Sequence, residues 1–569
     1  MTTHNLMNKF SLFNGDFVQW LDDYDPEENG YFHALFADPP YALIENNKRF
    51  KNPNSSEPDS TYAGGAYTRQ AKGFMGTDWD GFKSLKHYQE WVTSWAVKLP
   101  RIMAPGAVVA VFGGSRTFHR LAVGLEDGGL EIFDVVMWVY GSGMPKSLNI
   151  GRAIDRRSGM ESAKKRRMKR DGTPSNSTRP GTSVAHNDWG DKDLSYTDFV
   201  TDEARRWGGH GTLLKPAYEP VILARIPRGK NSFIDLAQNF QTGALNIEKA
   251  RIETAGAYDE AGRFPSNVVL SHKPGCKLIG HERRYIHAPG DVTRAGTDDN
   301  QIYGALNART DERNHAPDGT ELIEVWDCLP GCPVAQLDEQ SGITEGKEQT
   351  HKKPSGSRRM EFGFNDNYQA PNYSDSGGAS RFFYTGKASP LERILPGYLS
   401  PRRDLKKSAR ADLLAKMAGL GEQPLFGSND IFPRDSVPFN LRWKFEPSRA
   451  THPTVKPIDL VTYLAKMLLP PDGGQPRRLL IPFSGVGSEM IGAHFAGWEQ
   501  IQGVELTGSY IPQALDRLNF WAKYPTYESA IYGYNQKKDK IKKHQRQRTA
   551  EENAGLARLP LFRDMESSP

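Results

Sequence analysis

The segment Asp38-Pro39-Pro40-Tyr41 holds groups that suit chemistry on an exocyclic amine of a nucleobase. The lone pair of such an amine is delocalised into the ring, so the nitrogen is a poor nucleophile. The Asp38 carboxylate and the Pro39 carbonyl can accept both amino hydrogens, in a loop that two prolines stiffen. Tyr41 offers an aromatic face on which a base flipped out of a duplex can stack. An ordinary turn at the end of a strand is the alternative, because Asp and Pro are favoured in turns.

A second segment, Phe483-Ser484-Gly485-Val486-Gly487, comes directly after an expected strand and shortly before an expected helix. Its glycines let the backbone approach a ligand closely, and the helix N-terminus faces that ligand. Glu505 ends the next expected strand about 20 residues on, where an acidic residue can bind ribose hydroxyls. No Walker lysine follows the glycines, so the pattern favours an adenosine cofactor over a nucleoside triphosphate.

All three cysteines fall in two similar Pro-Gly turns, residues 272–276 and 328–332. Each turn offers a pair of soft ligands, His272 with Cys276 and Cys328 with Cys332. Together the four side chains predict one structural zinc site filled entirely by protein ligands. The alternative is three reduced, partly buried thiols with His272 on the surface.

Short apolar runs alternate with helical patterns on both sides of a long central segment. The expected strands are residues 31–37, 107–112, 131–140, 218–225, 478–481 and 499–505, and the expected helices are 86–103, 117–126, 457–469 and 488–496. This alternation is typical of an α/β fold with a doubly wound sheet. From about residue 230 to 445, Gly, Pro, Asn and Ser punctuate short apolar stretches, which indicates an inserted domain.

The 569 residues are too many for one compact core, and 37% hydrophobic with 25% charged residues is typical of a soluble protein. No apolar run approaches the roughly 18 residues that a bilayer span requires, so we expect no membrane segment. The N-terminus lacks a secretory pattern, and we expect a cytoplasmic protein. Net charge is +5, but basic residues concentrate at 163–170 and 537–548, where they would attract a phosphate backbone or form solvated charge runs.

The order of these motifs resembles the beta class of S-adenosylmethionine-dependent amino DNA methyltransferases. In that order the Asp-Pro-Pro-Tyr segment comes first, then a long insertion, then residues 452–457 with the sequence HPTVKP, the glycine loop and the GVE of residues 503–505. The resemblance covers nearly the whole chain and is nearest to N6-adenine methyltransferases common in phages and prophages. These enzymes carry stretches similar to residues 74–80, 138–147, 211–220 and 380–384.

The resemblance implies a permuted Rossmann-like methyltransferase sheet with a large inserted target-recognition domain. Residues 1–229 would form the catalytic half, with a basic insertion at about 152–210, and residues 446–530 the cofactor-binding half. Residues 230–445 would be the target-recognition domain, and residues 531–569 a basic, flexible tail.

The resemblance also implies a set of site residues. The catalytic residues would be Asp38, Pro39, Pro40 and Tyr41, and the residues that bind S-adenosylmethionine would be Asp16, Asp38, Lys456, Phe483, Ser484, Gly485, Gly487 and Glu505. One departure matters. The family usually has Asp directly before the Pro-Phe of the glycine loop, near the methionine amino group, and this chain has Ile481. We therefore expect another group, Asp38 being the candidate, to take part of that role.

The expected activity is site-specific transfer of a methyl group from S-adenosylmethionine to adenine N6 in double-stranded DNA, as in phage and restriction-modification enzymes. Cytosine N4 is the alternative, although N4-cytosine relatives more often carry Ser in place of Asp38. RNA methylation and a catalytically inactive DNA-binding protein are less favoured, since a large insertion suits readout of a duplex and the motifs are intact. The sequence leaves no separate nuclease-sized segment and does not distinguish a monomer from a dimer.

Overall fold

A computed structural model provides the structure of the chain, and it describes the following residues: 2–42, 82–140, 147–160, 163–164, 197–252, 264–273, 275–285, 320–342, 344–345, 376–377, 379–386, 390–402, 405–425, 431–452 and 455–536. The basic tail at 537–548, residues 74–80 and nearly all of the basic run at 163–170 lie outside these ranges. No helix in the described ranges has the length and apolar character needed to cross a membrane.

The chain folds into two compact units. Unit 1 comprises residues 1–134, 221–246 and 388–569, and unit 2 comprises residues 135–220 and 247–387. Unit 1 therefore contains described strands from both the N-terminal and the C-terminal part of the chain. These boundaries differ from the segments expected from the sequence. Residues 388–445 group with unit 1, and residues 135–220 group with unit 2. The target-recognition role of residues 230–445 stays a prediction.

A mostly parallel sheet forms the centre of unit 1. Its strands follow the order β1 (Thr2–Leu6), β2 (Phe10–Asn14), β19 (Gln500–Glu505), β18 (Arg478–Pro482), β3 (Phe32–Ala37), β4 (Met103–Phe112) and β8 (Tyr218–Arg225). Neighbours from β2 to β4 run parallel, while β1 and β8 run antiparallel to theirs. The expected α/β class is confirmed, with a permuted order that places strands from both ends of the chain side by side.

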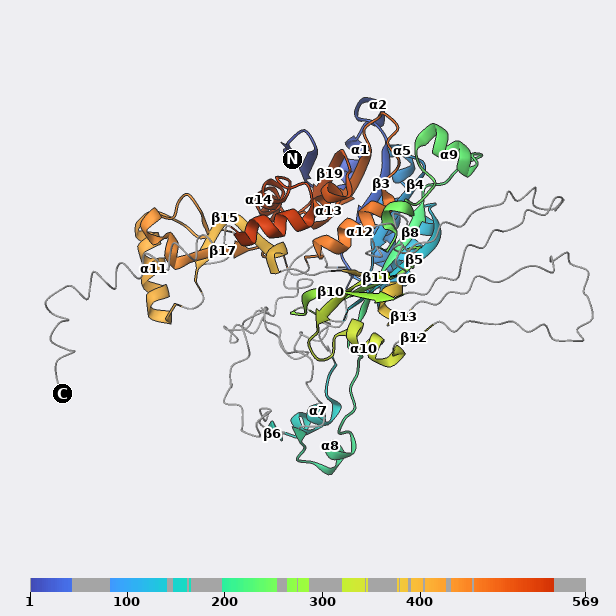
Figure 1. Cartoon of the computed structure of the whole chain (residues 1–569). Coiled ribbons are helices and arrows are strands. Elements are labelled where there is room, and N and C mark those ends of the chain that lie inside the picture. The colour runs from blue at the N-terminus through green and yellow to red at the C-terminus, as the bar shows by residue number, and fades with distance from the viewer. Residues whose placement is uncertain are drawn as a thin grey trace, which may run out of the picture. The chain divides into compact units, whose positions relative to one another are not determined.

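Helices cover this sheet because both of its faces are apolar. Among the described residues, the helices of unit 1 outside residues 390–449 include α1 (Phe17–Asp23), α2 (Pro26–Asn29), α4 (Leu85–Ala96), α5 (Leu99–Ile102), α6 (Phe118–Asp127), α9 (Phe233–Phe240), α12 (Ile458–Leu468), α13 (Ser488–Ala496) and α14 (Ile511–Trp521). Helix α12 packs on α13 (Figure 1), and contacts between residues also place α4 against α6. The strands β3, β4 and β18 read as nearly continuous apolar runs, as expected for strands buried on both faces.

The expected single helix over residues 86–103 is wrong. Helix α4 ends at Ala96, the short α5 begins at Leu99, and Met103 already starts β4. Pro100 is the physical reason: it lies in the first turn of α5, where its missing N–H is tolerated. Inside a continuous helix the same proline would remove a hydrogen bond and clash with the preceding turn.

Residues 390–449 add a smaller structure to unit 1. Strand β15 (Ile394–Pro401) pairs antiparallel with β16 (Phe432–Pro433) and β17 (Phe445–Arg449), and α11 (Lys407–Gly419) lies nearby in sequence. Seven buried residues give this part its own core: Leu399, Leu413, Met417, Phe432, Val437, Leu441 and Phe445. Its core explains why the Gly- and Pro-rich texture of the sequence does not mark a structureless loop here.

Unit 2 contains parallel strands and a two-stranded arm. Most of β5 (Glu131–Tyr140) belongs to it, and β5 pairs in parallel with β9 (Val268–Ser271), which pairs in turn with β14 (Tyr384–Gly386). The arm consists of β10 (Lys277–Tyr285) and β11 (Thr320–Asp327) in antiparallel register. Other described elements of unit 2 include α7 (Ile150–Arg157), α8 (Asp202–Arg206), α10 (Pro333–Ser341), and the strand pairs β6 (Ala163–Lys164) with β7 (Thr197–Asp198) and β12 (Thr344–Glu345) with β13 (Ser376–Gly377).

Candidate active site

The two chemical segments meet at one edge of the unit 1 sheet. Strands β3 and β18 are parallel neighbours, with Leu479 opposite Ala34 and Leu480 opposite Leu35. Asp38 directly follows β3, and the glycine loop directly follows β18. The carboxyl ends of neighbouring parallel strands lie together, and this edge is where open α/β sheets bind ligands. The permuted order of the sheet therefore brings together two segments that are more than 400 residues apart in sequence.

Asp38, Tyr41 and Lys456 form a hydrogen-bonded triangle at this edge. The Tyr41 hydroxyl donates to Asp38 Oδ1 at 2.9 Å, and Lys456 Nζ donates to Asp38 Oδ2 at 2.6 Å. Lys456 Nζ also lies 3.1 Å from the Tyr41 hydroxyl oxygen. The side chains of Lys456 and Asp38 are only 5% and 12% exposed, so this is a nearly buried ion pair with both carboxylate oxygens engaged.

Neighbouring groups fix the Asp38 loop in place. The Thr117 hydroxyl donates to the Tyr41 carbonyl at 2.7 Å. A side chain at Gly114 would place its Cβ 3.2 Å from the Tyr41 side chain, so the glycine allows close approach here. Lys456 Nζ lies 4.8 Å from the centroid of the Phe112 ring. Pro39 is buried and Pro40 is partly buried beside these groups.

The glycine loop departs from regular backbone geometry at three positions. The φ angles of Phe483, Gly485 and Gly487 are +58°, +51° and +78°. Positive φ suits glycine but is uncommon for Phe, and such residues concentrate at ligand sites. The Phe483 ring packs against the rings of Phe17 and Trp91, each with a centroid distance of 5.3 Å, so aromatic packing holds this backbone in place.

Glu505 closes the glycine loop from the adjacent strand β19. One carboxylate oxygen accepts the Gly485 amide and the other accepts the Thr507 amide, both at 2.7 Å. Only 7% of Glu505 is exposed. Burial raises the pKa of this carboxyl, although the amides of Thr507 and Gly485 oppose the shift. The Asn14 side chain donates to the Glu505 carbonyl at 2.8 Å, which ties strand β2 to the same corner.

Two other predicted cofactor residues have contrasting surroundings. Ser484 is 2% exposed, and its hydroxyl has no hydrogen-bond partner among the described residues. A buried hydroxyl without a partner is uncommon and marks a place where a ligand or water completes the site. Asp16 instead caps helix α1, because its carboxylate accepts the Gln19 amide at 3.0 Å. Asp16 thus has a local structural role, and its role in binding a cofactor stays a prediction.

Glu489 belongs to the site and was missed by the sequence reasoning. It lies in the first turn of α13, directly after the glycine loop, and is 5% exposed. Burial, followed by the negative charge of Asp38, raises the pKa of the Glu489 carboxyl to about 7, while Lys456 opposes this shift. The sequence did contain a signal, an acidic residue on an otherwise apolar buried helix.

Unit 2 brings the four predicted metal ligands together. The candidate ligand atoms of His272, Cys276, Cys328 and Cys332 all lie within 4.8 Å of one another. The Sγ atoms of Cys328 and Cys332 are 3.4 Å and 3.5 Å from His272 Nδ1. The prediction that these residues form one cluster is confirmed, whereas the metal itself stays a prediction.

Comparisons with known proteins find similarity in part of the chain. Residues 32–168 match the model of a family described as DNA methylase. Among curated proteins, the chain is 23% identical over 159 residues to the type II methyltransferase M.HindIII of Haemophilus influenzae, covering 27% of this chain. The chain spans 50% of the length of that relative.

Solved structures with some likeness include the PvuII DNA methyltransferase, described as cytosine-N4-specific, at 8% identity. Its TM-score is 0.32, and the alignment covers 90% of this chain and 86% of that one. Another is a putative DNA modification methylase from Thermus thermophilus complexed with S-adenosyl-L-methionine, at 10% identity and a TM-score of 0.28, with 90% and 93% covered. Likeness of this degree has no bearing on the function of the present chain.

Proposed function

We propose that the chain is an S-adenosylmethionine-dependent DNA methyltransferase that methylates adenine N6 in double-stranded DNA. The observation that carries the proposal is the meeting of Asp38 and the glycine loop at the carboxyl ends of β3 and β18. A carboxylate suited to an amine lies beside a loop suited to an adenosine cofactor. The match of residues 32–168 to the DNA methylase family supports the same reaction class.

The residues of the loop fit S-adenosylmethionine. The Glu505 carboxylate uses one acceptor position on each oxygen for a backbone amide, which leaves the remaining lone pairs for two ribose hydroxyls. The buried Ser484 hydroxyl supplies a further polar group without a partner among the described residues. Gly485 and Gly487 let the backbone approach the ligand. When bound, the cofactor supplies an electrophilic methyl group on its sulfonium sulfur.

Asp38 and Pro39 prepare the amine for attack. The Asp38 carboxylate accepts one amino hydrogen and the Pro39 carbonyl accepts the other, which localises the nitrogen lone pair. Lys456 and the Tyr41 hydroxyl hold the carboxylate at a fixed position, so little reorganisation is needed when the base arrives. The ring of Tyr41 offers the stacking face for the flipped base.

Glu489 is our candidate for the carboxylate that the family has at the position of Ile481. It is buried in the first turn of the helix that follows the glycine loop, and its charge interacts with Asp38 and Lys456. A carboxylate there complements the cationic amino end of S-adenosylmethionine. Two acidic groups and one lysine then share the site, and the amino group of the cofactor restores the balance of charge.

Asp38 favours adenine over cytosine N4, which is the alternative acceptor and requires the same chemistry. A catalytically inactive DNA-binding protein is a weaker alternative, because the Asp38–Tyr41–Lys456 triangle is fully formed. A role in phage or restriction-modification systems is part of the proposal. The proposed methyl transfer requires S-adenosylmethionine and no metal ion.

The proposal is tested by incubating the full-length chain with plasmid DNA and methyl-labelled S-adenosylmethionine, followed by nucleoside analysis. N6-methyladenine is the expected product, and N4-methylcytosine would move the chain to the alternative acceptor. Absence of label in duplex DNA, single-stranded DNA and RNA alike would overturn the proposal, provided that calorimetry shows a folded protein. Methylation-sensitive sequencing of the same plasmid then identifies the recognition site.

A further inference from the structure

We propose that His272, Cys276, Cys328 and Cys332 hold one structural zinc ion that fastens the base of the β10–β11 arm to β9 and α10. The ligand atoms come from unit 2 alone, and the inference does not depend on the proposed methyl transfer. Three thiolates and one imidazole form a donor set that proteins use for structural zinc. All four coordination positions are then filled by protein, which leaves none for water or substrate.

The distances between ligand atoms suit a tetrahedral ion. Zinc bonds of about 2.3 Å to sulfur and about 2.0 Å to nitrogen place sulfur and nitrogen about 3.5 Å apart in a tetrahedron. The structure has 3.4 Å from Cys328 Sγ to His272 Nδ1 and 3.5 Å from Cys332 Sγ to the same nitrogen. The ligand atoms of all remaining pairs, including those with Cys276 Sγ, lie within 4.8 Å of one another. Small side-chain rotations can bring two sulfur atoms to the spacing of about 3.8 Å that a tetrahedral zinc site requires.

The two turns present their ligand pairs in the same way. In each turn the amide of the closing cysteine donates to the carbonyl oxygen of the second residue, at 3.0 Å for Cys276 and 3.1 Å for Cys332. The glycine before that cysteine has a positive φ in both, +107° at Gly275 and +75° at Gly331. This repeated geometry points both ligand pairs of unit 2 at one position.

A backbone hydrogen bond and a helix N-terminus favour negative charge on two of the three sulfur atoms. The Leu329 amide of one turn donates to Cys276 Sγ of the other turn at 3.3 Å. Cys332 is the N-cap residue of α10, a helix of nine residues, so the positive end of the helix dipole favours a thiolate at this position. The Lys273 ammonium donates to the Pro330 carbonyl at 2.8 Å, which links the two turns a second time.

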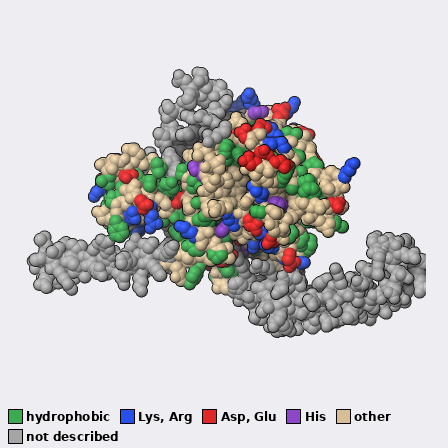
Figure 2. Space-filling view, turned by 90° about the horizontal axis from the view of Figure 1, so that it is seen from above, with side chains coloured by type: hydrophobic (Ala, Val, Ile, Leu, Met, Phe, Trp, Pro, Cys, Tyr) green, Lys and Arg blue, Asp and Glu red, His purple; other side chains and the backbone are tan. Residues whose placement is uncertain are grey.

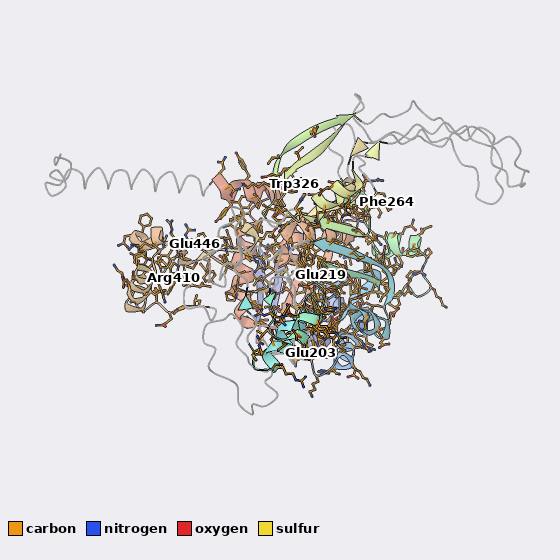
Figure 3. All side chains as sticks on the ribbon, turned by 90° about the horizontal axis from the view of Figure 1, so that it is seen from below. Glu203, Glu219, Phe264, Trp326, Arg410 and Glu446 are labelled. Atoms are coloured by element: carbon orange, nitrogen blue, oxygen red, sulfur yellow. The ribbon has the colours of Figure 1, made fainter. Side chains whose placement is uncertain are left out.

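The imidazole is also oriented by its surroundings. The His272 ring stacks on Trp326, with centroids 4.0 Å apart and an interplanar angle of 23°. Trp326 lies near the base of the arm and is labelled in Figure 3. The adjacent Ser271 accepts a hydrogen bond from Trp138 Nε1 at 2.8 Å, which ties the end of β9 to β5. A ligand held in one orientation loses little entropy when the metal binds.

The position of the cluster shows what the ion would do for the fold. His272 directly follows β9, Cys276 directly precedes β10, Cys328 directly follows β11, and Cys332 directly precedes α10. Within the described ranges, the apolar cluster around these ends has three buried members, Leu270, Cys332 and Val334, with seven partly buried hydrophobic residues packed against them. Such a core is small, and a metal crosslink supplies stability that it lacks. The ion would therefore determine whether the arm has a fixed base.

The test is elemental analysis of the full-length protein purified without a metal-affinity tag. We expect about one zinc per chain, and we expect Cys332→Ser to lose it. His272→Cys keeps four soft ligands and should retain zinc, so it tests the ligand set if the Cys332→Ser variant does not fold. The matched control His210→Ala should leave the zinc content unchanged. Replacement of zinc by Co²⁺ should give the visible absorption of a tetrahedral cobalt–thiolate site.

Less than about 0.2 zinc per chain, with melting unaffected by strong chelators, would overturn the proposal. A disulfide between two of the three cysteines in protein prepared under reducing conditions would also overturn it. Iron in place of zinc would keep the ligand set but contradict the identity of the ion. None of these measurements uses methyl transfer, so an inactive enzyme that holds zinc would leave this inference standing.

Discussion

Replacement of the buried Glu489 by Gln should make the protein more stable at neutral pH. The folded state raises the pKa of this carboxyl from 4.5 to about 7, chiefly by burial and then by the charge of Asp38. Between these pH values the folded state holds a proton that the unfolded state has lost. The free energy of unfolding therefore decreases as pH rises through this window and is constant above it. At about 1.4 kcal/mol per pKa unit, the decrease is about 3 kcal/mol.

Glutamine resembles the protonated acid in size and stays neutral. We expect Glu489→Gln and the wild type to have similar stability near pH 4.5, and the variant to be more stable by about 3 kcal/mol at pH 7.5. Urea unfolding followed by tryptophan fluorescence over a series of pH values measures the difference. Equal dependence on pH in both proteins would refute the reasoning, as would a variant that is less stable than the wild type at pH 7.5.

Glu499 provides a control of opposite sign. Its hydrogen bonds and ion pair with Arg477 lower the pKa of its carboxyl, so the stabilisation it contributes is lost as pH falls through the lowered value. Glu499→Gln should therefore destabilise the protein at neutral pH, with a difference that vanishes in acid. The two variants should give pH profiles that diverge in opposite directions.

Three further substitutions separate the roles within the site. Glu505→Ala should weaken S-adenosylmethionine binding by about tenfold or more, measured by calorimetry, without altering which DNA site is methylated. Tyr41→Phe should keep base stacking but lower kcat about fivefold, because the hydroxyl that donates to Asp38 is lost. Tyr41→Ala should lower kcat and should also lose the 2-aminopurine fluorescence of a flipped base. Lys456→Met should lower kcat more than it raises the Kd for S-adenosylmethionine, because Lys456 holds Asp38. The reverse result would assign Lys456 mainly to cofactor binding.

The sequence predicted where the two candidate segments lie relative to the strands better than it predicted the contacts between them. Asp38 and the glycine loop were recognisable because prolines and glycines restrict the backbone locally, and a parallel sheet then places the ends of their strands together. The ion pair between Asp38 and Lys456 joins residues 418 positions apart, and no local pattern indicates which carboxylate a lysine will find. Glu489 was hidden for the same reason, since its environment is set by tertiary packing.

The boundaries of elements and units were less predictable. Helical periodicity continued through Val97 and Lys98, and only the position of Pro100 at a helix start explains the break between α4 and α5. The Gly- and Pro-rich texture of residues 390–449 suggested the inserted domain, although this part packs its own core within unit 1. On the face shown in Figure 2, lysine and arginine side chains are interspersed with acidic side chains.

The most direct test of the central claim compares Asp38→Ala with the wild type in two measurements on the same preparations. Single-turnover methylation of duplex DNA should fall by orders of magnitude, because the acceptor for the amine hydrogen is removed, while calorimetric binding of S-adenosylmethionine should change little. The exposed Asp435→Asn serves as the matched control and should behave like the wild type in both. Near wild-type turnover in Asp38→Ala would show that the carboxylate at the end of β3 does not act on the amine, which would contradict the proposed role of this residue in methyl transfer.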